Sequence, residues 1–202
     1  MSDGTRLPGI PRHSDSGAEG LYPRLLGSQW SHLAEPVQRL HRGPAGVRAE
    51  GRFDVRRGTG PLARWIGAAL GLPPAGTEVP VRLSVDRRPH GERWHRTFGT
   101  SSLVTEQRER PDGLLAERLG LGELYFRLEV ADGGLILSQT GAALCLGRLR
   151  VPLPRFFAPR ADGHEAAAPD GKGVRVGVRL TAPLAGLLAE YEGIVELQEP
   201  HP

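Results

Sequence analysis

The stretch VPVRLSVDRRPHGERWHRTF, residues 79–98, decides the fold of this chain. Its first half alternates apolar and polar residues, with Val79, Val81 and Leu83 on one side, and this period of two is typical of a β-strand with one buried face. Residues 87–91 hold a proline and a glycine and read as a turn, after which a second strand follows. We therefore expect an antiparallel hairpin here.

On both sides of this stretch the same alternation recurs along most of the chain, and glycine-bearing turns separate the strands. The further strands that we expect are 47–56, 101–107, 114–119, 126–130, 135–137, 174–180 and 188–197. Between them, residues 151–160 are rich in proline and read as a crossing segment. A long meander with one apolar face has to be covered by helices or to curl on itself.

Helical spacing is confined to the first part of the chain. Apolar residues four or three positions apart predict two short helices over 21–33 and 36–41, and a third helix is expected over 61–70. The apolar stripe of this third helix consists of Leu62, Trp65, Ile66, Ala69 and Leu70.

The predicted fold class is α+β. We expect a long antiparallel β-meander of eight to ten strands, curled into an open or closed barrel-like sheet and covered by two or three helices from the N-terminal half. Residues 1–18 are polar and rich in glycine, serine and proline, which predicts a disordered leader, and residues 19–198 are expected to form a single α+β domain.

Composition narrows the function classes. Of the 26 basic residues all but Lys172 are arginines, which fits either a GC-rich genome or recognition of phosphate and carboxylate groups. The net charge of +3 is the sum of +7 over residues 1–160 and −4 over residues 161–202. Because the positive excess is spread over 160 residues and forms no basic stripe, we expect no nucleic-acid partner. Because Cys145 is the only cysteine, the chain forms no internal disulfide, and we expect a cytoplasmic protein. No apolar run is long enough for a membrane span.

Several catalytic and cofactor motifs are absent. The chain has no glycine-rich phosphate loop, no G-x-S-x-G elbow and no histidine pair with zinc-ligand spacing, so we expect no cofactor and no metal and assign no catalytic residue. Three of the seven histidines, His13, His164 and His201, are expected in loops or tails.

Arg96 is the residue that the pattern singles out. It shares one strand face with Trp94 and Phe98, and two aromatic rings on that face should turn it inward together with the arginine. A buried arginine needs an anionic partner. It is either an anchor for a carboxylate or phosphate head group inside an apolar cup, or it reaches water at an edge, or it forms a structural ion pair. The acids available for such a pair are Glu106, Glu117 and Glu129.

Three functions remain open. The first is a non-enzymatic binding module for a small apolar or amphipathic ligand. The second is an enzyme acting on a lipid-like or carboxylate substrate, with His95, His41 or Tyr191 as acid or base. The third is an accessory domain that binds a protein through a sheet edge or residues 151–160. The candidate ligand-binding residues are Arg96, Trp94, Phe98, His95, His41 and Tyr191. An enclosed cavity of roughly a few hundred Å³ would favour the first two.

Six stretches taken in order resemble one family. They are LYPRLLG (21–27), GRFDVRRGTGPLARWIGAALGLPPAG (51–76), ERWHRTFG (92–99), DGLLAERLG (112–120), VPLPRFFAPR (151–160) and AGLLAEYEG (185–193). Over residues 21–197 the chain is similar to the bacterial domain of unknown function 4166 family, which has no assigned activity. Members of this family occur alone or fused behind a saccharopine-dehydrogenase-like NAD(P)-binding domain. The resemblance thus implies an NAD(P)-dependent oxidoreductase as a partner, and it transfers no catalytic residue.

Overall fold

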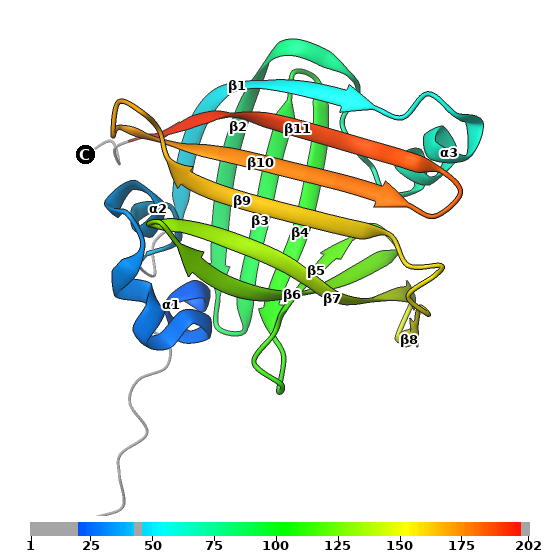
Figure 1. Cartoon of the computed structure of the whole chain (residues 1–202), viewed down its shortest axis with the longest axis horizontal. Coiled ribbons are helices and arrows are strands. Elements are labelled where there is room, and N and C mark those ends of the chain that lie inside the picture. Colours follow the sequence, from blue (N-terminus) through cyan, green and yellow to red (C-terminus); the bar gives the residue numbers. More distant parts are fainter. Residues whose placement is uncertain (1–19, 43–45, 199–202) are drawn as a thin grey trace, which may run out of the picture.

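The computed structural model describes residues 20–42 and 46–198, and these form a β-barrel with helices at its two ends (Figure 1). The expected leader over residues 1–18 lies outside the described residues. Eleven strands form one antiparallel sheet. They are β1 (Val47–Arg57), β2 (Gly76–Arg88), β3 (Gly91–Phe98), β4 (Ser101–Glu109), β5 (Leu115–Leu119), β6 (Gly122–Ala131), β7 (Gly134–Leu146), β8 (Leu149–Pro152), β9 (Arg160–Ala167), β10 (Gly173–Ala182) and β11 (Gly186–Leu197).

The barrel is closed by pairings between strands that are distant in the sequence. Strand order runs β6-β5-β4-β3-β2-β1-β11-β10-β9-β7, and β6 pairs with β7 to complete a ring of ten strands. The short strand β8 is added to the end of β7. The predicted fold class is therefore confirmed, and of its two variants the closed barrel is the one observed. The pairing of β1 with β11 connects the first strand with the last, which local alternation does not reveal.

Strand β9 lies where we expected a loop, and His164 accordingly belongs to a strand. Its sequence, RADGHEAA, holds no large apolar residue, so it has none of the alternation by which the other strands were recognised. It is a strand because it pairs along β10 on one side and with β7 on the other. His13 and His201 lie outside the described residues.

Two helices and a 3₁₀ helix cover one end of the barrel. They are α1 (Leu21–Leu26), η1 (Gly27–His32) and α2 (Glu35–His41), and Pro36 lies in the first turn of α2. The predicted helix over 21–33 is divided because Gly27 has a φ of 52°, a left-handed conformation that ends α1 and that glycine adopts at little cost. We call this the α1/α2 end.

A third helix, α3 (Pro61–Ala69), lies at the opposite end, which we call the α3 end (Figure 1). Only part of its apolar stripe packs on the barrel, since Ile66 and Leu70 are partly buried against the core. Ala63 and Gly67 are the buried residues of α3, whereas Leu62 and Trp65 are exposed. A Cβ at position 67 would lie 1.9 Å from the Arg57 guanidinium, so glycine lets α3 approach this side chain without moving it.

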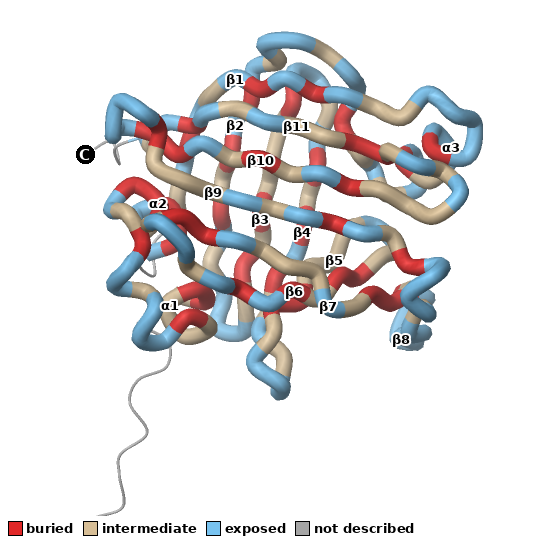
Figure 2. The backbone as a smooth tube through the Cα atoms, in the orientation of Figure 1, coloured by how far each residue is buried: buried red, intermediate tan, exposed pale blue. Residues whose placement is uncertain are grey.

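Buried residues line the inside of the barrel and continue into α1 and α2, as the buried segments in Figure 2 show. Inward-facing residues alternate along each strand, and on β3 Glu92, Trp94 and Phe98 are buried. None of the helices in residues 20–42 and 46–198 has the length and apolarity needed to cross a membrane.

Candidate functional site

A cavity of about 110 Å³ lies inside the barrel, and its wall is mostly apolar. It is smaller than the few hundred Å³ that we expected. The rings of Phe53, Phe98 and Tyr191 occupy part of the interior, and the centroids of Phe98 and Tyr191 are 5.3 Å apart. Tyr22 from α1 and Leu40 from α2 also belong to the wall. An apolar cavity of roughly 150 Å³ is known to hold benzene, so the space suits a small molecule or one end of a larger one.

Arg96 lies in the cavity wall, as the strand pattern predicted. Its Nη1 donates to the Thr105 hydroxyl at 2.9 Å and lies 3.7 Å from Glu117 Oε1, and its guanidinium carbon is 4.9 Å from the centre of the Trp94 ring. The side chains of Arg96 and Glu117 are only 18% and 16% exposed. Of the three acids considered as ion-pair partners, the structure brings Glu117 to Arg96, whereas Glu106 and Glu129 are exposed.

These contacts leave part of the guanidinium's hydrogen-bonding capacity unused. An arginine has five N–H donors, and one hydrogen bond with one longer ion pair satisfies only a part of them. Because Glu117 offsets the charge of Arg96, the pair is close to neutral. It can therefore bind a hydroxyl, an amide or a carboxylic acid group without a large cost in uncompensated charge.

A second polar group lies where α1 and α2 meet the barrel. The Tyr22 hydroxyl donates to Gln107 Oε1 at 2.9 Å, and His41 Nε2 lies 2.6 Å from Glu165 Oε2. Since a carboxylate only accepts, Nε2 carries the hydrogen. The Nδ1 atom of His41 is buried without a hydrogen-bond partner among the described residues. Burial, followed by the nearby charge of Glu165, raises the pKa of Tyr22 well above its ordinary value, so its hydroxyl stays protonated.

Tyr191 reaches the cavity from β11. Its ring packs against Phe98 and, at 6.1 Å between centroids, against Phe53. Burial raises the pKa of Tyr191, so a neutral phenol faces the interior. This neutral hydroxyl can donate a hydrogen bond, but it does not act as a base near neutral pH.

The structure brings together four of the six candidate residues, since Arg96, Trp94, Phe98 and Tyr191 all line the cavity. His41 is fully buried behind it and contacts the ring of Tyr22 at 3.8 Å between centroids. His95 does not belong to the site. It alternates with Arg96 on β3 and points outward, where its Nε2 lies 3.4 Å from Asp86.

Sequence reasoning missed three further residues of the site, Tyr22, Thr105 and Glu165, and considered Glu117 only as a partner of Arg96. Glu165 had no signal, because β9 has no apolar alternation. Thr105 and Glu117 face inward on β4 and β5, and the period of two would have placed them there once the register was known. Among the described residues, no three histidine, cysteine or acidic side chains are grouped so that they could hold a metal ion.

Comparison with protein families gives a match over residues 33–194, about four fifths of the chain. The matching family is described as Domain of unknown function (DUF4166), and the chain belongs to it. The resemblance to this family is thereby confirmed, and five of the six stretches lie within the match. No curated protein matches the chain. The family description assigns no activity, so the site has to be interpreted from its own chemistry.

Proposed function

We propose that this DUF4166 domain is a non-enzymatic binding module that holds a small apolar or amphipathic ligand inside its barrel. The observation that carries the proposal is the largely apolar cavity of about 110 Å³ with Arg96 in its wall. Binding sites for small molecules are typically concave and apolar, with few polar groups that fix the orientation of the ligand.

The wall suggests how such a ligand lies. Its apolar part contacts Leu83, Leu103 and Phe98, and its polar end reaches the unused donors of Arg96. Because Glu117 already offsets the charge of Arg96, a neutral polar end is favoured over an anionic one. The ligand is thus closer to an alcohol or an amide with a short hydrocarbon chain than to a fatty-acid anion.

A pair of probes tests the ligand class. Hexanol and hexanoate have the same chain length and differ in charge, so each can be titrated into protein with ¹³C-labelled methyl groups while NMR spectra are recorded. We expect hexanol to shift the methyl signals of Leu83 and Leu103 and to leave those of the outward-facing Ile194 in place. Hexanoate is expected to bind more weakly. If neither probe moves the interior signals, the ligand proposal is wrong.

The role of Arg96 needs a variant that keeps the interior neutral. In the double variant Arg96→Leu with Glu117→Gln no carboxylate is left unpaired, and we expect hexanol affinity to fall about tenfold, as for the loss of one or two hydrogen bonds. The matched control is Arg82→Leu on the outer face of β2, where Arg82 pairs with Glu50 in solvent. Equal affinities of the two variants would remove Arg96 from the site.

The second candidate function, an enzyme acting on a lipid-like or carboxylate substrate, is favoured by one observation. The 2.6 Å contact between His41 and Glu165 is the arrangement by which a carboxylate orients a general base. The full burial of His41 argues for a structural role instead. Hydrolysis of p-nitrophenyl butyrate that is lost in His41→Asn and kept in His95→Asn would support the enzyme, and absence of turnover supports binding alone.

The biological setting is also a proposal. We propose a bacterial cytoplasmic protein that works beside an NAD(P)-dependent oxidoreductase, supported by the single buried Cys145 and by the resemblance discussed above. Fractionation of the native cells, with capture of crosslinked partners, tests both parts. An extracytoplasmic location would contradict the first, and recovery of the chain without an oxidoreductase would contradict the second.

A further inference from the structure

Exposed apolar side chains are concentrated at the α3 end. Of the eleven large apolar residues that are exposed in the described part of the chain, nine lie there, and only Ile136 and Ile194 lie on the barrel wall. The nine are Leu62, Trp65, Leu121, Leu146, Leu149, Val151, Phe156, Phe157 and Leu184. We call them the apolar rim. Such a concentration is unusual for a surface in water and indicates an interaction site.

The rim is made of several separate tips that lie close together. Leu184, in the β10–β11 turn, is 95% exposed, and this turn adjoins the start of α3, since Gly58 donates to the carbonyl of Leu188. The β5–β6 turn with Leu121 is bonded to β7 through the amide of Cys145 at 2.7 Å. Figure 1 shows α3, β8 and the β10–β11 turn at the same end of the barrel.

The most prominent tip is the segment after β8. Phe156 and Phe157 are 68% and 63% exposed, and their rings contact one another at 4.3 Å between centroids. A turn holds them in place, because the amides of Phe157 and Ala158 both donate to the carbonyl of Pro154. The two rings are thus presented to solvent on an ordered backbone.

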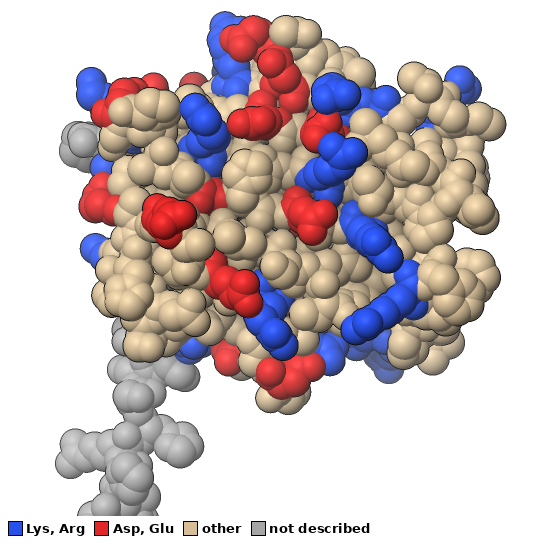
Figure 3. All heavy atoms as spheres, in the orientation of Figure 1, with Lys and Arg blue, Asp and Glu red and all other residues tan. Residues whose placement is uncertain are grey.

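The segment that carries Phe156 and Phe157 is basic. The sequence from Gly133 to Ala161 contains four arginines and no acidic residue. Arg148, Arg155 and Arg160 are exposed and form no ion pair with a described residue. On the face drawn in Figure 3, this end is tan with blue spheres.

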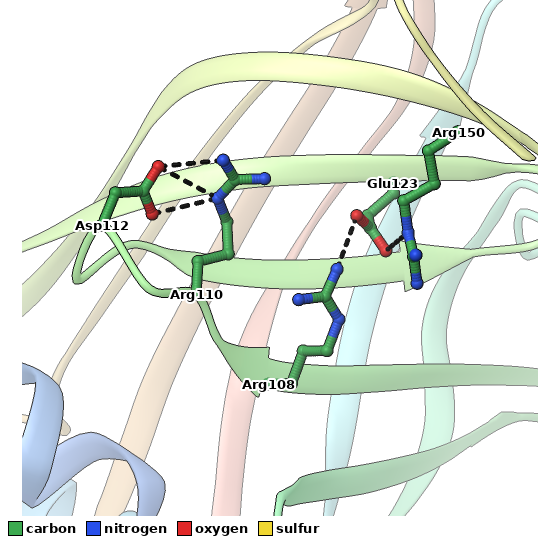
Figure 4. Close-up of polar contacts among 5 residues, drawn as sticks. All are labelled: Arg108, Arg110, Asp112, Glu123 and Arg150. Carbon is green, nitrogen blue, oxygen red and sulfur yellow. Dashed lines mark hydrogen bonds and ion pairs between the residues drawn. The ribbon is translucent and has the colours of Figure 1, made fainter.

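The fourth arginine anchors β8 to the barrel. Arg150 Nε lies 3.3 Å from Glu123, whose other oxygen accepts from Arg108 at 2.8 Å (Figure 4). Glu123 is buried and faces two arginines, so it contributes no net negative charge to this surface. Exposed aromatic and aliphatic tips bordered by unpaired arginines are complementary to a surface that offers hydrocarbon beneath phosphate groups.

We propose that the α3 end docks on an anionic lipid bilayer, with the apolar rim in the interfacial region and Arg148, Arg155 and Arg160 bound to lipid phosphates. A bilayer fits better than a protein partner, because the rim consists of discrete tips at one end of the barrel and none of them forms a groove. The proposal does not depend on a ligand in the cavity.

Vesicle co-sedimentation tests this directly. The full chain is mixed with phosphatidylcholine vesicles that do or do not contain phosphatidylglycerol. We expect binding to the anionic vesicles and much weaker binding to the neutral ones. Phe156→Ser with Phe157→Ser should reduce the partition coefficient at least about tenfold, and Arg148→Gln with Arg155→Gln should reduce it by about the same factor.

Matched controls change the same chemistry elsewhere. Ile136→Ser with Ile194→Ser removes exposed apolar groups from the barrel wall, and Arg39→Gln with Arg82→Gln removes the same charge from arginines that pair with Glu35 and Glu50. Both controls should bind as the parent does. Circular dichroism checks that every variant is folded, and single substitutions replace any double variant that is not.

Three results would overturn the proposal. The first is no sedimentation with anionic vesicles, and the second is an equal loss of binding in the controls. The third is a dimer in light scattering that is disrupted by the Phe156 and Phe157 substitutions in the absence of lipid, because the rim would then be covered by a second copy of the chain.

Discussion

The two ends of the barrel are covered in different ways. At the α1/α2 end the helices are part of the core, with Leu21, Leu26, Val37 and Leu40 all buried. At the α3 end a helix packs through Ala63 and Gly67 and leaves Trp65 71% exposed. Both ends close the barrel, but the second leaves more of its large apolar side chains exposed.

The difference follows from what lies beneath each helix. Under α2 is the open mouth of the barrel, into which Leu40 and Tyr22 project. Under α3 is Arg57, whose Nη1 donates to the carbonyls of Leu72 and Pro73 at 2.8 Å each. Burial lowers the pKa of Arg57, but a guanidinium remains charged near neutral pH. The residue of α3 that lies against it, Gly67, is small, whereas Leu62 and Trp65 are exposed to solvent.

The largest difference between the two ends is expected in how far a substitution in each helix lowers the free energy of unfolding. Leu40→Ala should lower the free energy of unfolding by about 3 kcal/mol, because it leaves a cavity in a fully buried site. Leu62→Ala in α3 should change it by less than about 0.5 kcal/mol. Urea unfolding followed by circular dichroism measures both. Equal losses would show that Leu62 contributes to the core as much as Leu40 does.

The polar contact at the α1/α2 end is the next test. In the parent, the buried His41 donates a hydrogen bond to the charged carboxylate of Glu165. Glu165→Gln replaces this carboxylate by a neutral amide, and we expect the free energy of unfolding to fall by about 2 kcal/mol. The control is Glu192→Gln on the exposed outer face of β11, where we expect almost no change. Should both variants unfold at the same urea concentration, His41 and Glu165 do not hold α2 on the barrel.

A smaller effect concerns the anchor of β8 at the α3 end. Burial alone would raise the pKa of Glu123, but the hydrogen bond from Arg108 and the charges of Arg108 and Arg150 outweigh it and lower the pKa below the ordinary 4.5. The folded-state pKa is therefore the lower one. The stabilisation is present above the ordinary pKa and is lost as the pH falls through the folded-state value.

Glu123→Gln tests that sign. The variant should be less stable than the parent by about 1 kcal/mol at neutral pH. The difference should shrink as the pH falls below 4.5, because the unfolded parent takes up its proton there and the folded parent does so only at its lower pKa. The measurement is the free energy of unfolding of the parent and of the variant from neutral pH to below pH 4.5. A difference that grows in acid would contradict the stabilising role of Arg108 and Arg150.

The smallest effect on stability is expected at the apolar rim itself. Trp65→Ser should change the free energy of unfolding by less than about 0.5 kcal/mol, because the ring is mostly in solvent. Calorimetric unfolding provides the measurement. A loss of several kcal/mol would mean that Trp65 packs on the barrel and that the α3 end is an ordinary part of the core.

Much of this architecture is predictable from the sequence. In strands such as β2 and β10, apolar and polar residues alternate so regularly that the buried face can be predicted from the sequence. The inward direction of Arg96 follows from Trp94 and Phe98, which lie on the same face of the same strand. Strand β9 is different, since alanines, glycine and acids give no period, and its pairing with β7 and β10 is a tertiary effect. Closure of the barrel depends on such long-range pairs.

The candidate site was predictable to a similar degree. Trp94, Arg96 and Phe98 could be grouped because they are neighbours on one strand, whereas Glu165 enters from β9 and Tyr22 from α1. His95 shows the limit of reasoning by residue type. A histidine between two site residues is attractive for chemistry, but strand geometry turns it outward to Asp86. The exposure of Trp65 was not predictable either, because helical periodicity places it on the same apolar stripe as Ile66.

The central claim, that the barrel interior holds a small ligand, is tested most directly by mass spectrometry under native conditions on protein isolated from its own cells. The account predicts a complex heavier than the 21.8 kDa chain by one small organic molecule, which is released on unfolding and competed away by hexanol. The Arg96→Leu and Glu117→Gln double variant should carry less of it than Arg82→Leu. If the protein has only the mass of the chain, both when isolated from its own cells and after incubation with hexanol, the barrel interior does not hold a small ligand.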